Sequence, residues 1–397
     1  MMKSDFMDKL LHGVEVEWKA IWEVTTWDKR FNGISREKQS KVITYPYLLA
    51  ADLFKLAQDE GDVFLLSTGE QTGWTTEELA GEYIREGEVV TIPWGKSRPL
   101  NDVLKYYKGR FVTADNRIAT SSDTDKMLNK FLYYWLLNQS TVIDGFYRGS
   151  GIQHPSMASV LDMAIPIPTL EVQAEIVRIL DTFTELTAEL TAELTARNKQ
   201  YNYYRDKLLT FEEGEVEWKP LGELAENHDS MRKPITSGLR EIGDIPYYGA
   251  SGIVDYVKDF IFDGDYLLVS EDGANLLARR TPIAFSISGK SWVNNHAHVL
   301  KFNTYAERKY IEYYLNSIDL TPYISGAAQP KLNQRNLNAI HIPNPSLEDK
   351  ERIVSILDKF ETLTTSIQEG LPREIELRQK QYEYYRNMLL SFPKEEV

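Results

Sequence analysis

Two long amphipathic segments dominate the hydrophobic pattern of the chain. In the first, apolar positions recur every seven residues from Ile176 to Leu190, and a second stripe runs from Leu180 to Leu194. Two stripes with this period make the seam of a coiled coil. The segment begins after two prolines with Thr169 as a candidate N-cap, and it continues for about 40 residues, which would extend about 60 Å as a helix.

The chain carries this pattern twice, inside a larger internal duplication. Four short blocks occur in the same order in both halves, as residues 16–19 and 216–219, 165–171 and 342–348, 176–183 and 353–360, and 199–205 and 380–386. Each half is therefore predicted to be a variable module followed by a closely repeated helical one. The second helical module also carries Gly370 and Pro372, which should break or kink its helix near Leu371.

The order of the copies is circular. Asp8–Leu11 matches Asp206–Leu209, which ends the first repeated module, and the C-terminal segment 385–392 would lead naturally into 13–18. We therefore expect a pseudo-two-fold molecule whose termini lie close together.

A four-residue unit is repeated in the middle of the first helical segment. Thr187-Ala-Glu-Leu190 is followed directly by Thr191-Ala-Glu-Leu194. These are good helix-forming residues, and one added unit would lengthen a helix by about 6 Å and rotate it by about 40° beyond a full turn. Thr187, Leu190, Thr191 and Leu194 are therefore candidate spacer-setting residues.

Composition and charge narrow the possible functions. The 397 residues include 45 Lys and Arg against 59 Asp and Glu, a formal net charge of −14, and 42% are hydrophobic, as in a globular protein. The absence of cysteine excludes disulfides, iron–sulfur clusters, thiolate zinc sites and a cysteine nucleophile. Acidic residues near the start and the lack of any run of about 18 apolar residues predict a cytoplasmic protein. The acidic balance argues against a free-standing nucleic-acid-binding domain.

Catalytic and cofactor motifs are incomplete in this sequence. Gly95-Lys96-Ser97 and Gly289-Lys290-Ser291 lack the earlier glycine that a phosphate-binding loop requires. Glu17-Trp-Lys19 and its copy resemble part of a metal-dependent nuclease strand, but a short strand with an anchoring Trp is favoured. His296 and His298 have the spacing that places two imidazoles on one strand face, yet no third metal ligand is evident, so a structural or DNA-facing role is favoured. We therefore predict no catalytic residue and no metal site.

The repeated blocks resemble the specificity (S) subunits of type I restriction–modification systems, in particular the group with Thr-Ala-Glu-Leu repeats. The resemblance covers the Val-Glu-Trp-Lys segments, the Pro-x-Pro sequences before both helices, the repeat tract and both Lys-Gln-Tyr-x-Tyr-Tyr-Arg helix ends. It also covers 245–249, 266–273 and 326–332 in the second module, whereas 151–157 in the first module only loosely echoes 326–332.

The resemblance implies an α+β fold with two similar mixed α/β target-recognition domains, separated by two long helices in an antiparallel coiled coil, within a pseudo-two-fold internal duplication. Each domain would read one half of a split double-stranded DNA site, and the number of repeats would set the length of the unread spacer. Two methyltransferase (M) subunits would dock on the helices, and restriction (R) subunits would join through them. S-adenosylmethionine, ATP and Mg²⁺ would then bind only in those partner subunits, with no cofactor in this chain.

Domain boundaries are predicted from the positions of the repeats. They are 1–24 for an N-terminal segment that completes the cyclic repeat, 25–165 for target-recognition domain 1, 166–212 for conserved spacer helix 1 with the repeats, 213–345 for target-recognition domain 2, and 346–397 for conserved spacer helix 2.

A DNA-recognition domain needs Lys or Arg for phosphates and polar side chains for base edges. Clusters of such residues in the first module give the candidate DNA contacts Lys96, Arg98, Lys105, Lys108, Arg110 and Arg117. In the second module the candidates are Tyr248, Ser251, Asn275, Arg279, Arg280, Lys290, Asn295, His296, Gln329, Lys331 and Asn333. Adjacent tyrosines at the helix ends cannot all face the helix seam, so the candidate partner contacts are Tyr201, Tyr203, Tyr204, Tyr382, Tyr384 and Tyr385.

An alternative interpretation is a non-catalytic, pseudo-symmetric coiled-coil adaptor that spaces two protein-binding domains and touches no DNA. The polar and basic clusters in both modules favour DNA recognition, whereas the net charge of −14 favours the adaptor. An acidic S subunit is consistent with DNA recognition if its partners supply positive charge around the duplex, and this chain alone should then bind DNA poorly.

Overall fold

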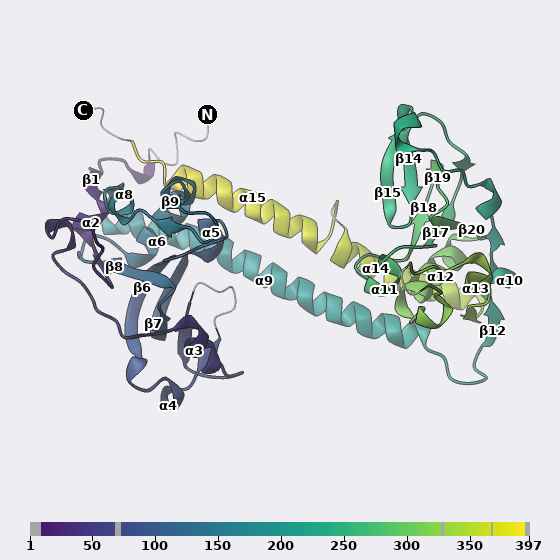
Figure 1. Ribbon diagram of the computed structural model, residues 1–397, viewed down its shortest axis with the longest axis horizontal. Coiled ribbons are helices and arrows are strands. Elements are labelled where there is room, and N and C mark those ends of the chain that lie inside the picture. Colours follow the sequence, from purple (N-terminus) through teal and green to yellow (C-terminus); the bar gives the residue numbers. More distant parts are fainter. Residues whose placement is uncertain (1–8, 68–72, 327–328, 367, 394–397) are drawn as a thin grey trace. The chain divides into compact units, whose positions relative to one another are not determined.

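The computed structural model describes residues 9–67, 73–326, 329–366 and 368–393. Contacts divide the chain into two compact units, one formed by residues 1–189 with 376–397 and the other by residues 190–375. They are called unit 1 and unit 2 below, and their elements carry the labels of Figure 1.

Unit 1 is built on a seven-stranded sheet in the order β2-β8-β6-β7-β4-β5, with β3 also paired to β7. Its strands are β1 (Glu17–Ala20), β2 (Thr25–Trp27), β3 (Tyr47–Leu48), β4 (Val63–Leu66), β5 (Trp74–Thr75), β6 (Arg85–Pro93), β7 (Lys105–Ala114), β8 (Arg117–Ser122), β9 (Tyr147–Arg148), β10 (His154–Pro155) and β11 (Ala164–Ile167). Its short helices are α2 (Ile21–Val24), α3 (Ala50–Lys55), α4 (Glu77–Ala80), α5 (Leu100–Val103), α6 (Asn129–Asn138), α7 (Ser140–Asp144) and α8 (Met157–Leu161).

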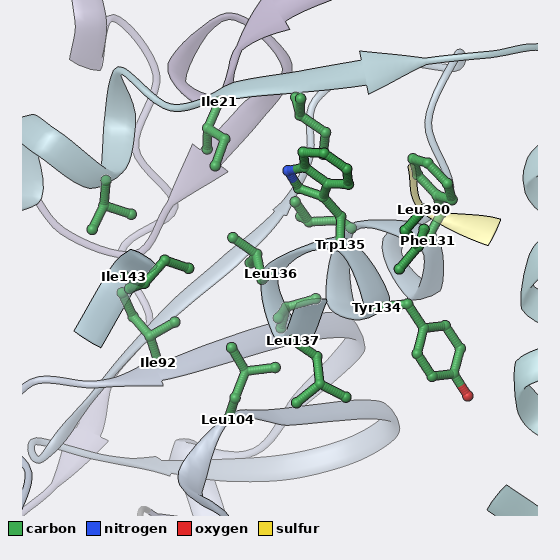
Figure 2. Close-up of a cluster of buried hydrophobic side chains, with 14 of the residues drawn as sticks. Ile21, Ile92, Leu104, Phe131, Tyr134, Trp135, Leu136, Leu137, Ile143 and Leu390 are labelled. Atoms are coloured by element: carbon green, nitrogen blue, oxygen red, sulfur yellow. The ribbon is translucent and has the colours of Figure 1, made fainter. Parts of the chain in front are cut away.

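The core of unit 1 lies around α6, which is apolar on most of its surface and therefore has to be enclosed. Phe131, Trp135 and Leu136 of this helix lie in one buried cluster with Ile92 of β6, as Figure 2 shows. Leu390, from the C-terminal end of the chain, belongs to the same cluster. The first and last parts of the sequence therefore fold into one core.

Unit 2 contains two four-stranded sheets, in the orders β13-β20-β17-β18 and β15-β14-β19-β16. Its strands are β12 (Glu217–Pro220), β13 (Glu226–Asn227), β14 (Ile242–Gly249), β15 (Gly252–Val257), β16 (Phe262–Asp263), β17 (Tyr266–Ser270), β18 (Ala284–Ile287), β19 (Lys290–Val293), β20 (Ala297–Lys301) and β21 (His341–Asn344). Its short helices are α10 (Leu221–Leu224), α11 (Asn275–Ala278), α12 (Tyr305–Ser317) and α13 (Gln334–Asn338).

The two units share one framework, which confirms the predicted pair of similar mixed α/β domains. The order β2-β8-β6-β7 in unit 1 corresponds to β13-β20-β17-β18 in unit 2, and every neighbouring pair in both orders is antiparallel. Helix α6 packs on this sheet in unit 1, and α12 packs on it in unit 2. The remaining strands differ, because unit 1 extends the shared sheet whereas unit 2 builds a separate second sheet. Variation between the modules is therefore concentrated outside the shared four strands.

The repeated Val-Glu-Trp-Lys blocks form matching strand pairs. Trp18 of β1 lies opposite Pro166 of β11, and Trp218 of β12 lies opposite Pro343 of β21. The predicted short strand is thus confirmed in both units, and Trp18 packs against the core of unit 1, whereas Trp218 is 45% exposed. The indole of Trp18 also donates a hydrogen bond to the carbonyl oxygen of Pro393 at 3.1 Å. The C-terminal segment therefore lies against β1, as the circular order of the repeats predicted.

The long helices also follow the prediction. Helix α9 (Leu170–Leu209) is continuous over 40 residues, whereas the second helical segment is divided into α14 (Leu347–Thr365) and α15 (Leu371–Leu389). At the break, Gly370 has φ +87°, and a Cβ there would lie 2.4 Å from the carbonyl oxygen of Thr362. Glycine is therefore needed in this connection, directly before α15 begins.

Aromatic pairs hold the long helices together inside each unit. Phe183 of α9 stacks on Tyr385 of α15 at 5.2 Å, and Phe360 of α14 stacks on Tyr204 of α9 at 5.7 Å, both with an interplanar angle of 24°. Since α9 passes from unit 1 into unit 2 and the second helical segment passes back, the two segments are antiparallel. In the part of the chain that the structure describes, no helix has the length and apolar character needed to span a membrane.

Equivalent hydrogen bonds fasten each variable module to its long helix. The hydroxyl of Tyr134 donates to Oδ1 of Asp181 at 2.6 Å in unit 1, and the hydroxyl of Tyr313 donates to Oδ1 of Asp358 at 2.6 Å in unit 2. Both tyrosines are buried. The duplication therefore extends to single side-chain contacts.

Candidate nucleic-acid interface

Each unit joins two loops at one end of its central strand. In unit 1, β6 ends at Pro93, and Lys96 then forms a bridge with Gln153 through two backbone hydrogen bonds of 3.0 Å. In unit 2, β17 ends at Ser270, and Asp272 bridges Lys331. These joined loops contain 151–156 and, among the described residues, 326 and 329–332, while 327 and 328 lie outside the described residues. The loose sequence echo between 151–157 and 326–332 therefore reflects an equivalent place in the fold. We call them the paired loops.

The lysine of the unit 1 paired loops is internal to the protein. Lys96 is 9% exposed, its Nζ lies 2.8 Å from Oδ1 of Asp144, and it lies 4.7 Å from the ring centre of Tyr147. The exposed side chains beside it are Trp94 and Ile152, at 39% and 65%. Lys96 therefore supports this loop from within, which is a correction to its predicted contact with DNA phosphate.

Three other basic candidates of unit 1 lie along β7. The antiparallel register pairs Lys105 with Thr91 near the end of β6 that leads into the paired loops, and it pairs Arg110 with Glu86 near the opposite end. Burial, with a smaller contribution from the charge of Arg98, lowers the pKa of Lys105 to about 8. The fold thus brings Lys105 and Arg98 to the loop end of the sheet and leaves Arg110 away from it.

The cations farther along β7 are paired with acids of the same unit. Arg110 forms ion pairs with Asp62 and, at 2.7 Å, with Glu77. Lys108 is exposed, and its Nζ lies 3.8 Å from Oε2 of Glu88. These cations would have to exchange carboxylate partners for phosphates in order to bind DNA.

Arg117 is a second correction. It is 1% exposed on β8, and its Nη1 lies 3.4 Å from Oδ2 of Asp28, which is also buried. Burial lowers the pKa of Arg117 to about 10, against the opposing effect of the neighbouring carboxylate. A guanidinium in this position cannot reach a phosphate, so Arg117 is left out of the proposed DNA contacts.

In unit 2 the paired loops gather candidates from separate parts of the sequence. Asn295, His296, Gln329 and Lys331 are all exposed there. Nδ1 of His296 lies 2.9 Å from both carboxylate oxygens of Asp272. The exposed groups therefore combine amides for base edges with cations for phosphates, which is the mixture that DNA recognition requires.

A charged cluster lies beneath the unit 2 paired loops. Arg232 donates to Oε2 of Glu271 at 2.5 Å, Nη2 of Arg232 lies 3.4 Å from Asp229, and Nζ of Lys331 lies 3.0 Å from Oε1 of Glu271. His298, which is fully buried, has Nδ1 2.6 Å from Asp229. Sequence reasoning missed Asp229 and Glu271, the acidic partners of His298 and Lys331, because it looked for cations and amides and ignored acids.

The two histidines do not share a strand face, contrary to the expectation from their spacing. His296 precedes β20 and points to solvent, whereas His298 lies within β20 and points into the protein. Ligand atoms of Asp229, Glu271 and His298 lie within 4.8 Å of one another, a spacing compatible with a metal ion. The guanidinium of Arg232 already contacts the carboxylates of both Asp229 and Glu271, however, so these side chains form an ion-pair cluster among themselves.

The other unit 2 candidates divide into structural and exposed residues. Asn275 accepts hydrogen bonds from the backbone of Arg280 and Thr281, and Asn333 caps α13. Arg279 donates to the carbonyl oxygen of Ile318. Tyr248 is half-buried against Phe285, and the exposed side chains of this group are Ser251, Arg280 and Lys290.

The candidate partner tyrosines fall into the two groups that the sequence predicted. Tyr201, Tyr204 and Tyr385 contact aromatic residues of the helix seam, and Tyr382 is half-buried. Tyr203 and Tyr384 are 60% and 49% exposed, and they occupy equivalent places in the two repeats. Exposed aromatic side chains of this kind are typical of protein–protein contacts.

Acid should destabilise unit 2 through its buried carboxylates. Burial opposes ionisation of Asp229 and Glu271, but hydrogen bonds from His298 and Arg232 respectively outweigh it and hold each pKa below the ordinary values of 3.8 and 4.5. A carboxylate with a lowered pKa stabilises the fold above its unfolded pKa, and this contribution disappears as the pH falls through the folded pKa. The melting temperature, measured by circular dichroism, should therefore fall as the pH is lowered below about 4.5. This fall should be less steep in Asp229→Asn.

The chain is similar to known proteins over its full length. It matches the family model described as type I restriction modification DNA specificity domain over residues 16–197 and again over 213–377. It is 35% identical, over an alignment of 433 residues, to the type I restriction enzyme EcoR124I/EcoR124II specificity subunit of Escherichia coli, covering 100% of this chain and 99% of that one. It is 32% identical to a putative type I restriction enzyme specificity subunit of Haemophilus influenzae, covering 98% of each. A crystal structure of a type I restriction–modification S subunit from M. genitalium has a similar fold, with a TM-score of 0.63, 16% identity, and coverage of 96% of this chain and 97% of that one.

Proposed function

We propose that this chain, which belongs to the family of type I restriction modification DNA specificity domains, recognises DNA. In this proposal the chain is the subunit of a type I restriction–modification complex that reads a bipartite target with an unread spacer. Unit 1 reads one half-site and unit 2 reads the other.

The duplicated paired loops carry the proposal. The bridge between Lys96 and Gln153 and the bridge between Asp272 and Lys331 present loops at the same end of the same framework. A protein that reads two half-sites needs one such surface on each recognition domain. The unit 2 surface offers Asn295, Gln329 and Lys331 to the duplex, and the unit 1 surface offers its loop residues with Arg98 and Lys105.

Continuity of α9 supports a spacer-setting role. The repeats from Thr187 to Leu194 lie in the middle of this helix, around the point at which the chain passes from unit 1 to unit 2. We infer that the number of repeats sets the spacer length, because an added unit changes the length and the rotation of the helix together.

Chemistry in this proposal belongs to other subunits. Two methyltransferase subunits dock on the long helices of this non-catalytic chain, and restriction subunits join through them. S-adenosylmethionine, ATP and Mg²⁺ bind in those partners, and the complex acts in the cytoplasm. The net charge of −14 supports this division, since the partners then supply much of the positive charge around the duplex.

Removal of the two exposed tyrosines should weaken docking of the methyltransferase subunit. Tyr203→Ser and Tyr384→Ser are each expected to reduce affinity about tenfold, because exposed aromatic residues carry much of the energy of protein interfaces. Isothermal titration with the purified methyltransferase subunit measures this. Tyr47→Ser, which changes an equally exposed tyrosine of β3, should leave the affinity unchanged. Equal effects of all three substitutions would contradict the assignment of the docking surface.

Footprinting of the chain with its methyltransferase subunits tests the function itself. Two protected half-sites separated by an unprotected gap are expected. Complete absence of sequence-dependent protection would favour an adaptor that spaces two protein-binding domains and would reject DNA recognition.

A further inference from the structure

Both ring nitrogens of His298 face hydrogen-bond acceptors. Nδ1 lies 2.6 Å from Oδ2 of Asp229, and Nε2 lies 2.7 Å from the backbone carbonyl oxygen of Leu332. Asp229 is an acceptor on its other oxygen as well, since Oδ1 receives the N–H of Val299 at 2.9 Å. A neutral imidazole has a single N–H and would direct a lone pair at one of these oxygens. Both bonds therefore form only when the ring carries two protons and a positive charge.

The buried charges around this ring are balanced by that proton. The side chains of Asp229, Glu271 and Arg232 are 7%, 11% and 13% exposed, and that of His298 is fully buried. Two carboxylates and one guanidinium leave one negative charge, which an imidazolium neutralises. The remaining charged groups nearby, Lys331 and the pair Asp272–His296, lie at the rim, where water screens them.

The ring holds one of the paired loops in place. Leu332 accepts from His298 through its carbonyl oxygen and donates its N–H to the carbonyl oxygen of Glu271 at 2.7 Å. Lys331, the preceding residue, is fixed by two backbone hydrogen bonds with Ser325. Loss of one proton from His298 would therefore release a contact directly beneath Gln329 and Lys331, the groups that this loop presents.

Unit 1 has a buried ion pair on the equivalent two strands, with a different cation. Asp28 follows β2 as Asp229 follows β13, and Arg117 lies on β8 as His298 lies on β20. Arginine keeps its charge across the neutral range, since burial lowers the pKa of Arg117 only to about 10. The two recognition units therefore differ in the type of buried cation on these strands, which is arginine in unit 1 and histidine in unit 2.

We propose that His298 is a positioning residue for the second half-site, and that recognition of this half-site alone depends on its proton. The doubly protonated ring holds residues 329–333 in the conformation that reads DNA. This inference rests on the proposed DNA-recognition function. It predicts that a rise in pH reduces sequence discrimination at the second half-site and leaves sequence discrimination at the first unchanged.

The experiment selects duplexes from a randomised pool with the full chain and its methyltransferase subunits, at several values between about pH 6 and about pH 9. Discrimination at the second half-site should fall at least about tenfold as the pH rises. Loss of the Lys105 charge, whose pKa is about 8, should weaken the contact of unit 1 with phosphate but leave the base preference at the first half-site unchanged. His298→Gln should lack second-half-site discrimination at every pH. His341→Gln, the same change at an exposed histidine of β21, should behave as the wild type. His296→Gln should retain the pH dependence, which separates the rim imidazole from the buried one.

A measurement without DNA keeps the test independent of the proposed function. In the ¹⁵N spectrum of the histidine-labelled full chain, both ring nitrogens of His298 should be protonated at low pH. The pH at which half of the molecules have lost one of these protons should match the midpoint of the loss of discrimination. A single protonated nitrogen throughout the range would overturn the inference, and so would an equal loss at both half-sites. Selection that ethylenediaminetetraacetate abolishes would also overturn it, because it would assign Asp229, Glu271 and His298 to a metal. Absence of any enriched sequence would instead reject the DNA-recognition function.

Discussion

Insertion of one Thr-Ala-Glu-Leu unit after Leu194 should change the spacer length that the protein accepts and leave both half-sites unchanged. Helix α9 is continuous through this point, so four further residues add about 6 Å and about 40° to it. The second helical segment is already interrupted at Gly370, which leaves α9 as the uninterrupted connection between the units. On the original spacer, one half-site would lose its contacts, and affinity should fall by at least about a hundredfold.

Binding of the complex to duplexes that differ only in spacer length measures this effect. The matched control inserts Gly-Ser-Gly-Ser after Gly214, in the turn between α9 and β12. Gly214 has φ +85° and open space around it, so that insertion lengthens a turn and no helix. An unchanged spacer preference after the helical insertion, or altered half-site sequences, would contradict the spacer-setting role.

The parts of the fold that repeat in the sequence could be predicted, because two segments with the same sequence pattern are expected to form the same element in each half of the chain. The recurrence of Val16–Lys19 predicted matching elements, and these became β1 and β12 with the same register against Pro166 and Pro343. The order of the strands could not be predicted in the same way. It depends on pairings such as β8 with β6 and β2, which bring together residues far apart in the chain.

The candidate site was predicted less well, because residue type alone does not report burial. Lys96 and Arg117 belong to a basic cluster in the sequence, and acids distant in the chain, Asp144 and Asp28, decide that both point inward. Conversely, Glu271 and Asp272 shape the unit 2 paired loops, although acidic residues are poor candidates for a surface that meets phosphate. Polar chemistry selected several residues that the fold brings together at the paired loops, and the ion pairs show which of the selected side chains are turned inward.

Arg117→Met should destabilise unit 1 by about 3–5 kcal/mol, because it leaves the carboxylate of Asp28 buried without its cation. Burial already raises the pKa of Asp28, against the opposing charges of Arg117 and Lys29. Oδ1 of Asp28 and Nε of Arg117 have no hydrogen-bond partner among the described residues. The pair is therefore costly to break and contributes little beyond mutual neutralisation.

The double variant Arg117→Met with Asp28→Asn should for the same reason recover most of the lost stability, to within about 1–2 kcal/mol of the wild type. Denaturant unfolding followed by tryptophan fluorescence reports mainly on unit 1, which holds six of the eight tryptophans: Trp18, Trp22, Trp27, Trp74, Trp94 and Trp135. Lys108→Met, at an exposed cation of β7, should leave stability nearly unchanged. If Arg117→Met instead kept full stability and reduced the salt dependence of DNA binding, Arg117 would be a phosphate contact, and the buried pair with Asp28 would not describe the protein in solution.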